Sequence, residues 1–250
     1  MLDKRFYWGT IRKSIVAFGN MFNNITIQRK DADGNNVQLI RVPISYAPKQ
    51  KFLARIQQRP DSTVRNTQIV LPRMSFEMIS LDYDPARKIS PIQRSRALSN
   101  DANTLNTQYA PTPYNITVVL YVYAKNQDDG LQIIEQILPY FNPDYNLTLK
   151  AVPELNILND LPIILDSIMF EDDYEGDFSV RRSIIWTLSF TMKLNFYGPV
   201  SPQGIIRKTI ANTYSNQELN NQQQKITIET DPSIALPTDD FNYLEIFEDF

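Results

Sequence analysis

The most constraining feature of the sequence is strict alternation of side-chain type in residues 115–124. The even positions 116 to 122 are all aliphatic, and Val119, Tyr121 and Tyr123 occupy odd positions between and beyond them. Successive side chains of a β-strand point to opposite faces, so this strand has two apolar faces. We therefore predict a central strand that is covered on both sides.

A second alternating pattern predicts a long antiparallel pair. Residues 161–170 and 178–197 are rich in apolar and β-branched residues, and they flank an acidic turn at 171–177. In the second segment, Trp186 and Leu188 belong to an apolar set that alternates with a more polar one. This pattern is typical of a half-buried antiparallel sheet.

Other segments add helices and one more hairpin. Helices are expected where apolar residues recur at three- and four-residue spacing, and Pro72 is expected to interrupt one strand. The resulting fold class is α+β, a mostly antiparallel sheet with packed helices and a long hairpin. The predicted helices are 9–23, 47–58 and 129–141, the hairpin joins 25–29 to 37–42, and the interrupted strand covers 67–83.

Two segments lack such periodicity. Residues 84–113 are rich in Pro, Ser, Asn, Thr and Arg, and we predict an extended loop there. Residues 212–224 are rich in amides, and from Glu229 to Phe250 there are seven acids and no Lys or Arg. We therefore predict one domain over 1–210, followed by an amide-rich linker and a flexible acidic C-terminal tail over 211–250.

The composition excludes several classes of function. The chain has no Cys and no His, which excludes Ser-His-Asp and Cys-His catalysis and nearly every structural zinc site. The formal net charge is −3, so no basic field attracts nucleic acid. No apolar run approaches the roughly 20 residues that span a bilayer, so we expect no membrane partner. We predict no enzyme activity, no cofactor and no bound metal.

The acidic turn at 171–177 is the best candidate for a chemical site. Its five carboxylates suit a divalent cation or a glycosidase pair, but adjacent turn acids usually point into solvent or toward a protein partner. We therefore treat Asp172 and Asp173 as interface candidates. Arg181 and Arg182 follow the turn and, on a strand, point to opposite faces, so one of them can pair with the turn acids while the other faces a partner or a helix terminus.

Aromatic and basic residues supply the remaining interface candidates. Aromatic residues at the N-terminus are either core packing or interface anchors, and those in the acidic tail are typical of a docking segment or of a solvating tail. Basic residues in the 84–113 loop suit an arm that wraps a neighbouring subunit or faces DNA, or a solvated loop. The candidates are Phe6, Tyr7, Trp8, Arg87, Arg94, Arg96, Phe241, Tyr243 and Phe247.

Several strings, in order along the chain, together resemble the tail completion and sheath stabiliser family of T-even-like contractile-tailed bacteriophages. The most specific is QIIEQILPYF at 132–141. The similarity runs from about residue 5 to 210 and does not include the amide-rich linker or the acidic tail. The other strings are FGNMF at 18–22 with ITIQR at 25–29, RVPISYA at 41–47 followed by Lys49 and Phe52, LPR at 71–73, and Arg181-Arg182 with IWTLSF at 185–190.

The resemblance implies a structural virion protein with an α/β sandwich fold. Members of this family form a hexameric ring at the head-proximal end of the tail, above a tail tube terminator. The ring holds the last sheath ring extended and joins the tail to the neck. The implied partners are other copies of the chain, the tail sheath protein, the terminator and a neck or head-completion protein. DNA passes through the ring without specific binding, and assembly takes place in the host cytoplasm.

Three alternatives remain open. The first is another tail terminator or neck connector ring protein, which would share the ring but bind different neighbours. The second is a virion glycosidase that uses the carboxylates at 171–177. The third is a nucleic-acid binder that uses Arg87, Lys88, Arg94 and Arg96, whose affinity would fall steeply with salt.

Overall fold

The computed structural model describes residues 5–30, 36–57, 70–98, 104–173, 183–235 and 239–250. The chain divides into two compact units, and each is built from separate stretches of sequence. The larger unit contains 7–89 and 111–197, and the smaller unit contains 1–6, 90–110 and 198–250. The predicted division into 1–210 and 211–250 concerns independent folding and stays a prediction.

The larger unit is built on a six-stranded sheet with the strand order β3-β4-β7-β10-β9-β8. Only the pair of β3 and β4 within it is parallel, so the prediction of a mostly antiparallel sheet is confirmed. The strands are β3 Ile44–Tyr46, β4 Arg73–Tyr83, β7 Thr112–Ala124, β8 Asp144–Val152, β9 Ile157–Asp173 and β10 Ser183–Phe196.

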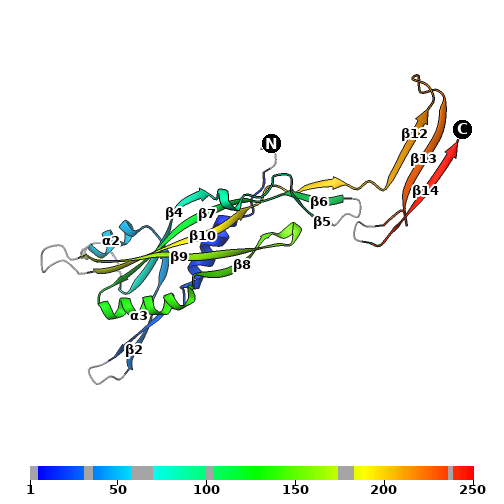
Figure 1. Cartoon of the computed structure of the whole chain (residues 1–250). Helices are drawn as coiled ribbons and strands as arrows, with labels where there is room; N and C mark the ends of the chain where they lie inside the picture. The colour runs from blue at the N-terminus through cyan, green and yellow to red at the C-terminus, as the bar shows by residue number, and fades with distance from the viewer. Residues whose placement is uncertain (1–4, 31–35, 58–69, 99–103, 174–182, 236–238) are drawn as a thin grey trace, which may run out of the picture. The chain divides into compact units, whose positions relative to one another are not determined.

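Strand β7 is central and is covered on both faces, as its alternation predicts (Figure 1). Its even-numbered residues, such as Leu120, join a core formed with helices α1 (Thr10–Met21) and α3 (Gln127–Ile137). Its odd-numbered residues, such as Tyr123, pack with helix α2 (Lys49–Gln57) on the opposite face. No helix in the described part of the chain is long and apolar enough to cross a membrane.

Phe18 of α1 lies at the centre of the larger core and is 0% exposed. Its ring centroid is 5.0 Å from that of Phe22, 5.4 Å from that of Phe76 and 5.2 Å from that of Phe190. A Cβ at Gly19 would lie 2.8 Å from the Phe76 ring, so this glycine permits the close approach of α1 to the sheet. Complete burial of one Phe side chain contributes about 1.5–3 kcal/mol.

The hairpin predicted at 25–42 is present in the larger unit as β1 (Thr26–Lys30) and β2 (Asn36–Arg41). The two strands pair antiparallel, with Thr26 opposite Arg41. The centre of its turn, residues 31–35, lies outside the described residues.

In the smaller unit, a three-stranded sheet corrects one prediction. Strands β5 (Arg94–Leu98), β6 (Thr104–Tyr109) and β11 (Ser201–Gly204) pair in the order β11-β6-β5, so the extended loop expected over 84–113 is wrong in these parts. Strand β6 contains two buried polar residues instead of an apolar alternation. Gln108 Nε2 donates a 2.7 Å hydrogen bond to Gly198 O, and Thr107 Oγ1 donates a 3.0 Å bond to Ser201 O.

The smaller unit has a second sheet with the order β12-β13-β14. Its strands β12 (Lys208–Tyr214) and β13 (Gln222–Asp231) take up both ends of the expected linker, and β14 (Asn242–Asp249) lies in the acidic tail. The tail therefore contains regular structure that we did not predict. All eight residues of β14 are exposed, so the strand is held by backbone pairing with little side-chain burial. The mobility of the tail stays a prediction.

Candidate interaction surfaces

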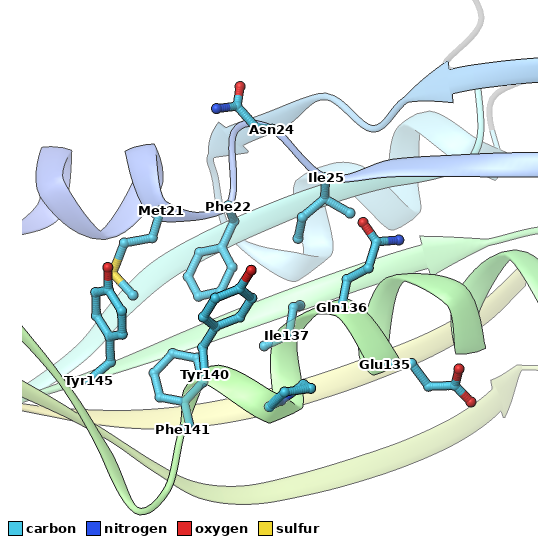
Figure 2. Close-up of a pocket in the computed structure, with 11 residues that line it drawn as sticks. Met21, Phe22, Asn24, Ile25, Glu135, Gln136, Ile137, Tyr140, Phe141 and Tyr145 are labelled. Atoms are coloured by element: carbon cyan, nitrogen blue, oxygen red, sulfur yellow. The ribbon is translucent and has the colours of Figure 1, made fainter.

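A groove of about 570 Å³ opens on the larger unit (Figure 2). Figure 2 shows aromatic side chains from the end of α1, the turn after α3 and the start of β8 around it. The Phe141 ring stacks on Phe22 at 6.4 Å and lies 6.2 Å from Tyr145. Tyr140 is 67% exposed at the groove. Its lining is Met21, Phe22, Asn24, Ile25, Glu135, Gln136, Ile137, Pro139, Tyr140, Phe141 and Tyr145.

Two glutamines of α3, of which Gln136 lines this groove, bind the backbone of β1. The Gln28 N–H donates a 2.8 Å hydrogen bond to Gln132 Oε1, and Gln132 Nε2 donates a 3.0 Å bond back to Gln28 O. Gln136 Nε2 donates a 2.7 Å bond to Thr26 O. The amide side chains thus bond to backbone groups of β1 as a neighbouring strand would, and they hold the hairpin against the helix.

A partly buried ion pair strengthens the same junction. Arg29 Nη2 lies 2.7 Å from Asp129 Oδ2, and Arg29 Nε lies 3.4 Å from Asp129 Oδ1. The Asp129 side chain is 3% exposed, whereas that of Arg29 is 40% exposed. The hydrogen bond to Asp129 raises the pKa of the Arg29 guanidinium above its usual value. Asp129 also lies in the first turn of α3, where a negative charge is favoured by the helix dipole.

The described residues lack the side-chain pattern of a metal site. They contain no group of three or more Asp or Glu residues positioned to hold a metal ion. Burial raises the pKa of Tyr123 to about 12 and also raises that of Tyr121. These phenols lie on the α2 side of β7 and not at the groove, and they stay protonated at neutral pH.

The N-terminal aromatic residues differ in their exposure. Phe6 is 47% exposed and Tyr7 is 76% exposed, whereas Trp8 is half-buried. An exposed ring such as that of Tyr7 suits an interface anchor, because aromatics are enriched at interface centres. Its role at an interface stays a proposal.

The three candidate arginines have different surroundings. Arg87 Nε donates a 2.8 Å bond to Asp84, and its Nη2 donates to Tyr114 O at 3.0 Å, so it braces the start of β7. The guanidinium of Arg94 lies 4.8 Å from the Tyr109 ring centroid. Arg94 and Arg96 are exposed two positions apart on β5 and hence share one face. Of the three arginines, Arg94 and Arg96 are the two whose side chains are exposed, and a role for them at an interface stays a proposal.

The acidic turn is described only at its start. Asp172 and Asp173 end β9, where they pair with Ile184 and Ser183 of β10. The neighbouring Glu171 accepts a 2.5 Å hydrogen bond from Lys49 Nζ of α2. The rest of the turn, with Arg181 and Arg182, lies outside the described residues.

The aromatic residues of the acidic tail lie on or next to β14. Tyr243 is 66% exposed and Phe247 is 58% exposed, and the Phe241 ring packs edge-on to Tyr243 at 5.5 Å. Sequence reasoning found these residues but missed the groove on the larger unit. The groove is made where α1 and α3 end, and the run of apolar residues past the end of α3, at 138–141, was the available signal.

Two comparisons with known proteins point in one direction. The family model of the T4-like virus Myoviridae tail sheath stabiliser matches residues 5–250. This range includes the linker and the acidic tail, to which the resemblance seen in the sequence did not extend. The tail completion protein gp15 of Enterobacteria phage T4 is 31% identical over 218 residues, which are 84% of this chain and 79% of that protein. The chain belongs to the T4-like Myoviridae tail sheath stabiliser family, whose members are structural proteins of the phage tail.

Proposed function

We propose that this protein forms a ring at the head-proximal end of a contractile tail. There it caps the tail, stabilises the extended sheath and joins the tail to the neck of the head. The family match over residues 5–250 carries this proposal. The ring acts by binding its neighbours, and no bond is made or broken.

The distribution of surfaces in the chain supports a ring. A cyclic ring uses head-to-tail contacts, so each copy needs two different faces that complement each other. The larger unit offers an aromatic groove, and the smaller unit offers an exposed, acidic and aromatic sheet. The two surfaces are different, as head-to-tail contact requires.

The charge of the chain supports a passive conduit for DNA. The formal net charge is −3, and phosphate contacts made by Lys and Arg are what hold proteins on DNA. A ring of such subunits lets DNA pass without specific binding. The further proposed partners are the tail sheath protein, the tail tube terminator and a neck or head-completion protein. The protein assembles in the host cytoplasm and stays in the virion.

Electron microscopy of the purified protein, together with its mass in solution, tests the ring. We expect rings with a central opening and a mass of about six chains. A protein that stays monomeric at the highest soluble concentration contradicts the proposal. Binding tests with purified tail and neck components then separate the functions. Binding to the neck alone, and not to the sheath, would identify a neck connector instead.

A further inference from the structure

A second groove, of about 410 Å³, lies between α1 and β8 on the larger unit. Lys13 Nζ donates a 3.1 Å hydrogen bond to Lys150 O, which fixes one ammonium at the groove, and the Lys150 side chain is exposed. Both charged residues of the lining are therefore cationic, and most of the remainder is apolar. The lining is Lys13, Val16, Ala17, Asn20, Leu149, Lys150 and Pro153.

Strand β14 of the smaller unit carries the complementary pattern. Side chains two positions apart share one face of a strand. Tyr243, Glu245, Phe247 and Asp249 therefore form one face, on which two exposed aromatic rings alternate with two exposed carboxylates. We call these four residues the acidic aromatic face. Residues 198–250 as a whole contain eight acidic and three basic residues.

The acidic aromatic face would gain stability from a partner that covered it. Among the described residues, its rings are left 66% and 58% exposed at Tyr243 and Phe247. A three-stranded sheet needs an apolar face covered to be stable on its own, and exposed apolar patches with a polar rim mark interaction sites. A partner that covers this face must supply apolar contact and positive charge together.

We infer that the acidic aromatic face of one copy docks in the α1–β8 groove of a neighbouring copy. The groove supplies two ammonium groups for Glu245 and for Asp249, which also accepts a 3.0 Å hydrogen bond from Gln224 Nε2 of its own chain. The apolar residues of the groove receive the aromatic rings. Because groove and face are different surfaces, every copy both gives and receives this contact, and a closed set of such contacts is a ring. The inference rests on the proposed ring and names the contact that closes it.

Paired charge reversals test this contact in the full-length protein. One variant combines Lys13→Glu with Lys150→Glu, and the other combines Glu245→Lys with Asp249→Lys. Each variant alone should associate at least about tenfold more weakly, because like charges then meet across the contact. An equimolar mixture should restore association, since the two variants can alternate around a ring with an even number of copies. Light scattering and electron microscopy measure both effects, and circular dichroism checks that each variant is folded.

The control reverses two exposed lysines outside the groove, with Lys51→Glu and Lys125→Glu combined. It should associate like the wild type. If rings still form in both the groove variant and the tail variant, the proposed ring is still supported and this contact is wrong. Defective variants that do not rescue each other also overturn it. If the wild type forms open chains and each reversal abolishes them, the contact is supported and the ring is contradicted. A wild type that stays monomeric contradicts both the contact and the ring.

Discussion

Replacing Gly130 by Ala should destabilise the larger unit, although alanine is the better helix former. Gly130 lies in the first half of α3 and faces the sheet. A Cβ at this position would lie 2.8 Å from Trp186 Nε1 and 3.2 Å from Trp186 Cδ1. The indole cannot withdraw freely, because it packs against Phe170 with ring centroids 4.8 Å apart. Glycine thus sets the distance between α3 and β10.

The size of the effect follows from two opposing terms. Alanine in place of glycine favours the helix by at most about 1 kcal/mol. Overpacking a close contact of this kind costs about 1–3 kcal/mol. At mid-range, about 2 kcal/mol of overpacking less about 1 kcal/mol of helix propensity gives an expected net loss of about 1 kcal/mol in the free energy of unfolding.

Urea unfolding followed by far-UV circular dichroism measures this loss. Gly204→Ala is the control, because no atom lies within 4 Å of the Cβ that it adds. Its stability should change by less than about 0.5 kcal/mol. Trp186→Phe makes room for the new methyl group, so Gly130→Ala should cost less in that background. A Gly130→Ala protein that is as stable as the wild type would refute the close-packing argument.

Three further predictions concern the larger unit. Since burial raises the pKa of Tyr123 to about 12, the unfolded chain loses this phenol proton first, near pH 10. The stability that this pKa difference contributes is complete below pH 10, and about 2–3 kcal/mol of it is lost as the pH rises to 12. Urea unfolding of the wild type and of Tyr123→Phe at alkaline pH measures this loss. Arg29→Ala leaves the carboxylate of Asp129 buried without its cation and should lower the free energy of unfolding by about 2–3 kcal/mol. Asp129→Asn should lower it by less, and equal losses in urea unfolding would contradict this. Gln132→Ala should speed hydrogen exchange at the Gln28 amide, and unchanged exchange would contradict the hairpin contact.

The elements that the sequence predicts are those in which apolar side chains recur with the period of a strand or a helix and fall on buried faces. Strand β7 is readable because both of its faces are packed, and its alternation therefore contains two apolar sets. Helix α1 can be predicted because Phe18, with Phe22 at its C-cap, falls on its buried face. The ends of the helices are less certain, because the end of α3 continues into a short 3₁₀ helix at Leu138–Tyr140.

Other elements could not be predicted because backbone pairing and polar contacts hold them. Strand β6 buries Thr107 and Gln108 through hydrogen bonds, so no apolar pattern marks it. Strand β14 mixes aromatic, aliphatic and acidic residues, a composition that is also typical of a docking tail. Both grooves form where elements far apart in sequence pack together, so the apolar run at 138–141 indicates only one wall of the first groove and no local pattern gives either groove as a whole.

Tails that are assembled without this protein provide the most direct test of its function. The labelled protein would be added to such tails, and electron microscopy would show where it binds and whether the sheath stays extended. We predict one additional disc at the head-proximal end of each tail and sheaths that remain extended during storage. Binding along the sheath or at the opposite end, or sheaths that contract equally with and without the protein, would contradict the account.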